Sequence, residues 1–418
     1  MFIVKQKEVT LRFAAQQSIH WMIVGLLIPV ITLIFQSKGL NLQQIGFVMA
    51  VWIGSTTLLE IPLGSLADTY GRRGTYLVSL LLNTLGCFVL YLANEVTFVL
   101  LAAALLGASR AVYSGTLDAW LYDAFHQVEG KQTYHSALAK INVAVTIGLA
   151  VGSLIGGWLP DIASNSANVF SSIYDINLLG VCIANIGLIV ITLMLIDDRR
   201  QRWNTQPKQA RENAFQLCTQ ALKVCWKHDV LSRLMQATVV FGMVLSSVEN
   251  YWQPYLADIL RGTSSGVIAF GVISALYFIM SAVSSLISVP LLRVFSGSHK
   301  TLMFTTRALA GVCFIFLAYT AHLLSFTLCY LLFFFLLTVG NNSESVLLHE
   351  NTEEKMRSTM LSISSFMVTC GGVFASLVFG VIAERFGISA RWIISGALLV
   401  FSSVVFIFVS EKRELRVR

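Results

Sequence analysis

Ionisable side chains lie inside long hydrophobic segments of this 418-residue chain. A charge at the centre of a bilayer costs about 2.5 to 3.5 kcal/mol, so each such group needs a partner, a wet cavity or a route to the interface. Carboxylates in this setting can take up and release protons when burial or a second acid opposes their ionisation. The intramembrane ionisable residues are His20, Glu60, Arg110, Asp118, Lys140, Glu249, Arg307 and Glu344. Their types indicate proton or solute movement across a membrane.

Four of these residues are candidates for proton coupling. At about 1.5 Å per helical residue, Glu60 and Asp118 are expected roughly 10 and 9 Å from the cytoplasmic ends of their segments, which would make them neighbours. Arg110 could then displace a proton from one of the two acids when the cavity reorganises, and Glu249 is the candidate acid of the second half. The alternative interpretation is a permanent ion-pair network that ties helices together.

A second group of polar and aromatic residues could bind solute. Pro254 removes a backbone hydrogen bond near Glu249, and an interrupted helix with an acid and aromatic rings suits an amphipathic or cationic solute. Each residue alone could equally be an interhelical hydrogen-bonding group. The predicted substrate-binding residues are Gln17, His20, Trp120, Glu249, Trp252, Gln253, Asn341 and Glu344. Lys140 and Arg307 are expected near cytoplasmic ends, with their charges reaching the interface.

Composition and hydropathy give the elements that position these groups. The chain is 56% hydrophobic and 12% charged, whereas soluble proteins carry about 25% charged residues. A spanning helix needs about 20 mostly apolar residues. Twelve such segments are predicted, at 13–35, 43–66, 75–93, 97–124, 137–159, 176–196, 234–260, 266–292, 301–320, 322–348, 358–382 and 389–410. We therefore expect an all-α integral membrane protein with twelve transmembrane helices.

The long polar interval 197–233 divides the twelve segments into six and six. We expect a six-helix bundle over 1–196, a cytoplasmic linker over 197–233, and a second bundle with a short tail over 234–418. Within the linker, 210–228 has apolar residues at helical spacing and predicts an amphipathic helix at the membrane interface. A solvated tether is the alternative. Lysines and arginines are concentrated in the loops on the side of both termini, which predicts that both termini are cytoplasmic. Lys38, Arg261, Arg385 and Arg391 are expected in external loops.

An internal repeat supports the six-plus-six division. The fifth segment contains GLAVGSLIG from Gly148, and the eleventh contains GVFASLVFG from Gly372. Small residues at four-residue spacing allow two helix backbones to approach closely. Their presence at corresponding places in the two halves predicts two pseudo-symmetric bundles.

The loop after the second segment contains an acid, a glycine turn and two guanidinium groups in GSLADTYGRR, from Gly64 to Arg73. Gly71 allows a tight turn, and Asp68 can pair with Arg72, Arg73 or a helix end. This loop resembles the conserved cytoplasmic loop GxLaDrxGRR of the major facilitator superfamily. Thr69 departs from the basic residue that is common there. The predicted gating residues are Gly64, Asp68, Gly71, Arg72, Arg73, Gly152 and Gly156.

Other segments extend the resemblance along essentially the whole chain, toward bacterial drug:proton antiporter-type exporters. GLAVGSLIGG is similar to their signature GxxxGPxxGG, with Ser153 in place of proline. Arg110 lies where the family often has an arginine, although the following glycine, Gly115, is one place late. The resemblance implies that helices 1, 4, 7 and 10 line a central cavity. Those segments hold His20, Arg110, Asp118, Glu249 and Glu344.

Together these features predict a secondary active transporter that exports a small organic solute by proton-coupled alternating access. The solute could be a drug, a siderophore or a secreted metabolite. The alternatives are a proton-coupled uptake symporter and a non-transporting membrane sensor or scaffold. The sequence contains no nucleophile–base or metal constellation and no phosphate-binding GxxxxGK[ST], so we expect no enzyme activity, cofactor or metal. Basic residues are scattered, which argues against nucleic-acid binding. We expect a monomer in a bacterial inner membrane.

Overall fold

The computed structural model describes residues 5–64, 71–164, 171–196, 223–263 and 266–408. These residues are almost entirely helical, and no strand occurs among them. Ten helices in this part of the chain are long and apolar enough to cross a membrane. Two compact units are formed, one by Met1–Trp203 with Leu260–Ile279 and the other by Asn204–Ile259 with Met280–Arg418.

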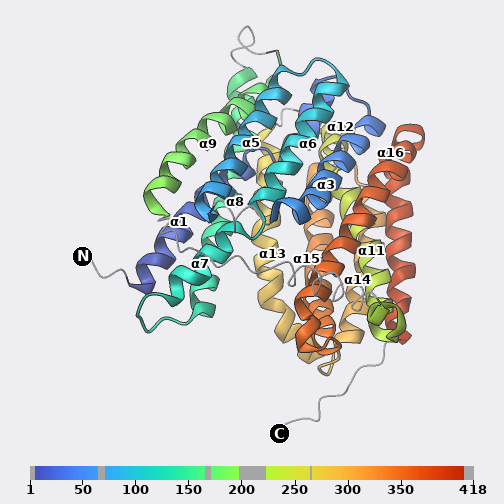
Figure 1. The fold of residues 1–418 in the computed structure, drawn as a ribbon. Coiled ribbons are helices and arrows are strands. Elements are labelled where there is room, and N and C mark those ends of the chain that lie inside the picture. The colour runs from blue at the N-terminus through green and yellow to red at the C-terminus, as the bar shows by residue number, and fades with distance from the viewer. Residues whose placement is uncertain (1–4, 65–70, 165–170, 197–222, 264–265, 409–418) are drawn as a thin grey trace. The chain divides into compact units, whose positions relative to one another are not determined.

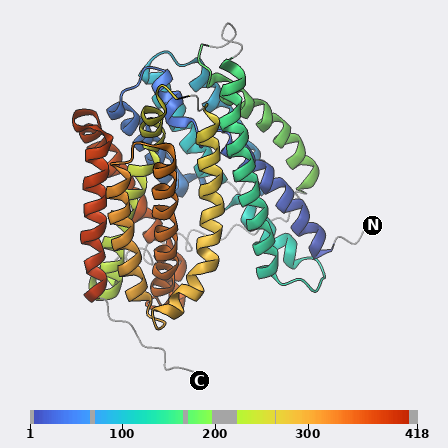
Figure 2. The same ribbon diagram turned by 180° about the vertical axis from the view of Figure 1, so that it is seen from behind.

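The first unit contains α1 (Gln6–Gly25), α2 (Ile31–Ser37), α3 (Leu42–Gly64), α5 (Arg72–Leu92), α6 (Val96–Tyr113), α7 (Thr116–His126), α8 (Tyr134–Ser164) and α9 (Asp175–Leu195). The second contains α11 (Asp229–Glu249), most of α12 (Trp252–Leu260), the end of α13 (Ile268–Val294), α14 (His299–Leu317), α15 (Leu323–Glu350) and α16 (Arg357–Ser403). The long helices within each unit lie alongside one another (Figures 1 and 2).

The twelve predicted segments all correspond to helices. The first is covered by α1 and α2. The last two lie in α16, where Gly387 adopts φ 85° and interrupts the helix, and in the 3₁₀ helix η2 (Val404–Phe408) that follows it. A positive φ is unfavourable for residues with a side chain, so glycine permits this junction. The predicted linker helix falls largely on residues outside the described part of the chain.

Two predicted spans are broken in the middle. The seventh is interrupted at Asn250 and Tyr251, between α11 and α12. Pro254 has no N–H for the Asn250 carbonyl, so this break was predictable. The fourth is interrupted at Ser114 and Gly115, where Gly115 adopts φ 69°. By contrast, α1 and α15 stay helical through the polar residues that interrupt their apolar sequence.

Glycines allow close helix packing in both units, through the repeat itself in the first unit and through the glycine just before the repeat in the second. A Cβ atom added to Gly152 of α8 would lie 2.0 Å from the Met22 carbonyl oxygen of α1. In the second unit, a Cβ on Gly371 of α16 would lie 2.1 Å from the Val239 carbonyl oxygen of α11. The repeat glycine Gly372 has no neighbour closer than 3.7 Å to an added Cβ. The helix α8 therefore packs on α1 in the first unit as α16 packs on α11 in the second, which agrees with the expected pseudo-symmetry of the two bundles.

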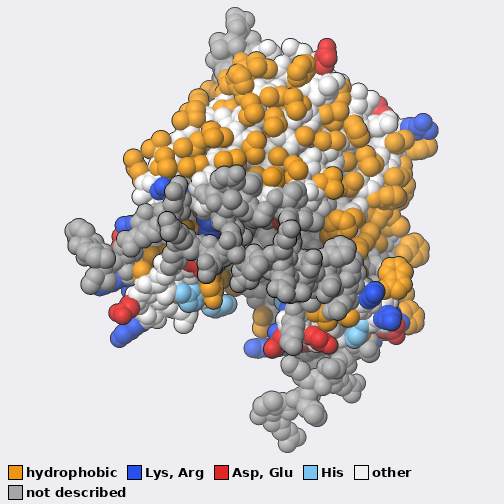
Figure 3. Space-filling model, viewed as in Figure 1, with side chains coloured by type: hydrophobic (Ala, Val, Ile, Leu, Met, Phe, Trp, Pro, Cys, Tyr) orange, Lys and Arg blue, Asp and Glu red, His pale blue; other side chains and the backbone are white. Residues whose placement is uncertain are grey.

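The outer surfaces of the helices carry large apolar side chains. In Figure 3 these side chains cover much of the face formed by α5, α6 and α9, whereas charged side chains are grouped near helix ends. Exposed examples are Leu81, Leu85 and Phe88 on α5, Phe98 and Leu101 on α6, and Ile183, Ile186 and Met194 on α9. Such large apolar patches are suited to lipid, not water.

Candidate functional site

A cluster of aromatic and polar side chains surrounds His20 on α1. The Tyr76 hydroxyl lies 2.9 Å from His20 Nδ1, and the Tyr113 ring stacks on the imidazole with centroids 4.5 Å apart. Trp21 contacts the same imidazole edge-on, with centroids 5.6 Å apart. Tyr76 is fully buried, whereas His20, Trp21 and Tyr113 are half-buried. The cluster therefore has a buried side, formed by Tyr76, and a partly accessible side, formed by the rings of Trp21 and Tyr113.

Gln17 is held in place beside this cluster. The Tyr113 hydroxyl donates to the Gln17 side-chain carbonyl at 2.9 Å, and the Gln17 amide donates to Gln16 at 3.0 Å. Gln16 in turn donates to the Thr192 hydroxyl of α9 at 3.3 Å. Two predicted site residues, Gln17 and His20, are thus brought together by Tyr113. Sequence reasoning missed both tyrosines, because nothing local to them indicates a partner on another helix.

The break between α6 and α7 gathers three of the four predicted coupling residues around one backbone interruption. Arg110 is in the last turn of α6, and its carbonyl accepts from Ser114 N at 3.0 Å. The Ser114 hydroxyl donates to Glu60 at 2.7 Å. Asp118 is in the first turn of α7, and the side chains of Arg110, Glu60 and Asp118 are all exposed. In the described part of the chain, no ion pair joins Arg110, Glu60 and Asp118.

The two arginines of the predicted gating loop both hold neighbouring helices. Arg72 contacts the Asp123 carboxylate and the Ala119 carbonyl oxygen of α7. Arg73 donates to the Ile196 carbonyl oxygen at 3.1 Å. Gly71 directly precedes α5 and adopts φ 88°, a conformation that favours glycine in a turn. Asp68 lies outside the described residues, and Gly64 ends α3. Asp123 was not predicted, although it lies on the same short helix as Asp118.

The predicted gating glycines of α8 pack within the first unit. A Cβ on Gly156 would lie 2.4 Å from the Leu26 carbonyl oxygen, close to the corresponding contact of Gly152. The adjacent Gly157 faces the start of α13, where a Cβ would lie 2.7 Å from the Gly271 backbone. On α8, Gly156 therefore packs toward α1, and the next residue, Gly157, packs toward α13.

Asp161 joins the end of α8 to the beginning of α13. Its carboxylate accepts hydrogen bonds from Val267 N at 2.8 Å and Ile268 N at 3.1 Å. The carboxylate therefore satisfies two amides that a helix start leaves unpaired. Burial and the negative charge of Asp161 raise the pKa of Tyr174, which precedes α9. Sequence reasoning did not single out Asp161.

In the second unit, Arg307 of α14 forms an ion pair with Glu344 of α15. Arg307 is fully buried and the Glu344 side chain is 12% exposed. Arg307 also donates to the Ala237 carbonyl oxygen at 3.2 Å and to Asn341 Oδ1 at 3.4 Å, while Thr238 donates to Glu344. The expectation that Arg307 reaches the interface is therefore wrong, because this side chain has partners inside the bundle.

The other predicted binding residues occupy separate places. Trp252 is buried against Tyr330, with ring centroids 5.4 Å apart, and Gln253 is also buried. The Glu249 side chain is exposed at the end of α11. In the first unit, Trp120 stacks on Phe13 of α1, with centroids 6.1 Å apart.

Two basic residues that were expected in external loops have partners inside their units. Lys38 lies 3.5 Å from the Asp175 carboxylate and donates to the Tyr91 carbonyl oxygen at 2.8 Å. Arg391 is fully buried, with its guanidinium 3.9 Å from the centre of the Tyr251 ring and its Nε donating to Ser247 at 3.3 Å. Hydropathy counting could not show these partners, because each acid or aromatic ring comes from another part of the chain.

Comparison with known proteins identifies this helical architecture. The family model of the Major Facilitator Superfamily matches residues 13–347. The chain belongs to the major facilitator superfamily. It is therefore a multi-pass membrane transporter, and the predicted all-α fold of twelve transmembrane helices in two pseudo-symmetric bundles is confirmed.

Curated relatives of this superfamily member are MFS-type transporters. The chain is 20% identical over 408 residues to the uncharacterized MFS-type transporter YxaM of Bacillus subtilis, a match that covers 96% of each chain. It is 23% identical over 239 residues to the quinolone resistance protein NorA of Staphylococcus aureus, covering 56% of this chain and 55% of NorA. The crystal structure of the nucleoside transporter NupG has the same fold, with a TM-score of 0.78 and 15% identity over 97% of this chain and all of NupG.

Proposed function

We propose that this superfamily member exports a small organic solute in exchange for protons, by alternating access. The observation that carries the proposal is the interruption of the fourth span at Ser114 and Gly115. At this break Arg110 and Asp118 belong to the facing end turns of α6 and α7, and Glu60 of α3 accepts a hydrogen bond from Ser114. Interrupted helices in transporters present backbone dipole ends to charged groups near the middle of the membrane.

Proton exchange requires acids whose protonation changes when the surrounding helices move. Glu60 is bonded to the end of α6 through Ser114, so a change at the break alters its surroundings. A proton bound by Glu60 or Asp118 would remove a negative charge that otherwise attracts Arg110. In this mechanism solute arrival favours one protonation state, and the conformational change carries the proton to the other side. Glu249 would serve the same purpose in the second half.

Solute binding is assigned to the predicted residues that the helices position. In the first unit Gln17 and His20 present an amide and an imidazole next to the half-buried rings of Trp21 and Tyr113. Trp120, Trp252, Gln253, Asn341 and Glu344 complete the proposed set. Aromatic faces and amides suit a planar organic compound such as a drug, a siderophore or another secreted metabolite. We propose gating by the loop from Gly64 to Arg73 and by the glycines of α8.

The remaining assignments follow from the sequence and the bacterial relatives. We propose that the protein lies in a bacterial inner membrane with both termini in the cytoplasm. The reason is that lysines and arginines are concentrated in the loops on the same side as the termini. The proposed partners are the solute, protons and lipid, and the proposed unit is a monomer.

The test is an internal-pH assay in proteoliposomes that contain the purified full chain. Candidate solutes are added outside while an encapsulated dye reports internal pH. Proton antiport moves protons out as solute enters, so the interior becomes alkaline whichever way the protein is oriented. Acidification would instead show symport, and binding of solute without any flux would show a sensor.

A further inference from the structure

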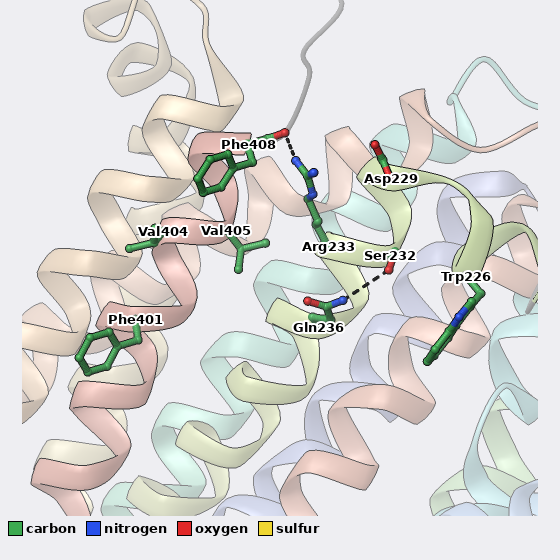
Figure 4. A pocket seen from close by; sticks show the side chains of 9 residues that line it. All are labelled: Trp226, Asp229, Ser232, Arg233, Gln236, Phe401, Val404, Val405 and Phe408. Atoms are coloured by element: carbon green, nitrogen blue, oxygen red, sulfur yellow. Dashed lines mark hydrogen bonds between the residues drawn. The ribbon is translucent and has the colours of Figure 1, made fainter.

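A groove lies at one end of the second unit, where α11 begins and α16 ends. It has a volume of about 450 Å³. Figure 4 shows Arg233 between the indole of Trp226 on one side and, on the other, Phe401 of α16 and the side chains of the following 3₁₀ helix η2 (Val404–Phe408). Its lining includes Trp226, Asp229, Arg233, Phe401, Val404, Val405 and Phe408. None of them belongs to the proposed transport site.

The large apolar side chains of the groove are exposed. The exposed fractions are 87% for Trp226, 74% for Phe401 and 66% for Phe408. Both helices are membrane spans, and the groove lies at their ends. The interface between hydrocarbon and headgroups is where amphipathic aromatic rings are stabilised, so lipid is the expected neighbour of these side chains.

The polar side of the groove has a positively charged centre. Arg233 donates to the Phe408 carbonyl oxygen, and its guanidinium lies 5.8 Å from the Phe408 ring. This contact positions the guanidinium, whose planar fork has five N–H donors and can bind phosphate through two of them. The segment from Lys223 to Arg233 contains three Lys or Arg residues and a single acid, Asp229. The local charge therefore favours an anionic headgroup.

We propose that this groove binds one anionic phospholipid. Its phosphate is held by Arg233 with help from the neighbouring positive charge of Lys227, and its first acyl carbons lie along Phe401, Val404 and Val405. In the proposed topology the groove is at the cytoplasmic surface, where anionic headgroups attract basic residues. The site is independent of the transport mechanism and would remain if the proposed direction of transport were wrong.

The test uses quenching of Trp226 fluorescence by brominated lipid. The full chain is reconstituted in phosphatidylcholine vesicles that contain either brominated phosphatidylglycerol or brominated phosphatidylcholine. The difference between the natural chain and Trp226→Phe isolates the signal of this indole. We expect phosphatidylglycerol to quench it with an association constant about fivefold higher, which corresponds to about 1 kcal/mol for one basic residue at an anionic surface.

Two variants separate charge from structure. Arg233→Gln should abolish the preference for phosphatidylglycerol, whereas Arg233→Lys should keep it, although lysine cannot reproduce the planar contact with Phe408. Arg293→Gln is the matched control, since Arg293 is an exposed arginine in the last turn of α13, and it should also keep the preference. Equal quenching by the two lipids, or a preference that survives Arg233→Gln, would overturn the proposal. Absence of quenching by either lipid would also overturn it, by showing that another occupant, such as residues 409–418, fills the groove.

Discussion

The guanidinium of Arg307, fully buried in α14, is paired with the carboxylate of Glu344 on α15. The pair links three helices, because Arg307 also bonds the backbone of α11 at Ala237 and Glu344 accepts from Thr238. A buried charge is tolerated only with such partners. Glu344 therefore has a structural constraint in addition to its proposed part in solute binding.

Removing one member of this pair should destabilise the second unit strongly. Glu344→Gln leaves the Arg307 charge buried without its partner, which costs about 3 to 5 kcal/mol. Thermal unfolding in mild detergent, followed by the reactivity of buried cysteines, measures the loss. The double variant Arg307→Met with Glu344→Gln should recover most of the stability. Arg357→Gln breaks an exposed ion pair with Glu354 and should have little effect. Equal losses in Glu344→Gln and Arg357→Gln would contradict the structural role.

Close backbone packing between α1 and α8 should not tolerate a side chain at Gly152. A methyl group there would lie 2.0 Å from the Met22 carbonyl oxygen, so Gly152→Ala must push the helices apart. Overpacking of this kind costs about 1 to 3 kcal/mol. The control is Gly187→Ala in α9, where an added Cβ meets no atom within 4 Å. We expect a lower unfolding temperature only for Gly152→Ala, and equal temperatures would show that the helices can separate freely.

The fold could be predicted largely from the sequence, because about 20 apolar residues are needed for each span and the chain shows twelve such runs. The break near Pro254 was predictable from a missing backbone donor. The break at Gly115 was not, because a glycine inside a span is more often a packing surface.

The candidate site was less predictable, because its side chains depend on partners from distant helices. From the sequence alone, Arg307 and Arg391 are expected to keep their charges in contact with water. In the structure Arg307 is instead paired with Glu344, and Arg391 lies against the Tyr251 ring. The role of Tyr113 could not be predicted for the same reason, since its hydrogen-bond partner Gln17 is 96 residues away in the sequence.

Capping by Asp161 should slow the opening of the first turn of α13. Asp161→Ala removes the acceptor for the Val267 and Ile268 amides, and loss of such a cap costs about 0.5 to 2 kcal/mol. Hydrogen exchange measured by mass spectrometry should be about fivefold faster at these two amides, corresponding to about 1 kcal/mol. Asp161→Asn keeps one oxygen acceptor and should show a smaller change. Unchanged exchange in the alanine variant would mean that the bonds do not stabilise the helix start.

The Tyr113 hydroxyl should matter for solute affinity more than for turnover. Tyr113→Phe leaves the ring stacked on His20 but removes one of the two hydrogen bonds that orient the Gln17 amide. A hydrogen bond of this kind contributes about 0.5 to 1.5 kcal/mol, so KM for a transported solute should rise about two- to tenfold. The control is Tyr319→Phe, an exposed tyrosine away from the cluster. An unchanged KM would remove Gln17 from the proposed binding site.

The central claim, that acids at the helix break couple solute to protons, is tested most directly by comparing two fluxes in Glu60→Gln and Asp118→Asn proteoliposomes. One is solute counterflow without a pH gradient, and the other is accumulation driven by an imposed pH gradient. We predict that at least one of these variants keeps counterflow and loses gradient-driven accumulation, while Glu95→Gln, which changes an exposed acid at the start of α6, keeps both. Normal gradient-driven accumulation in both Glu60→Gln and Asp118→Asn would contradict the account.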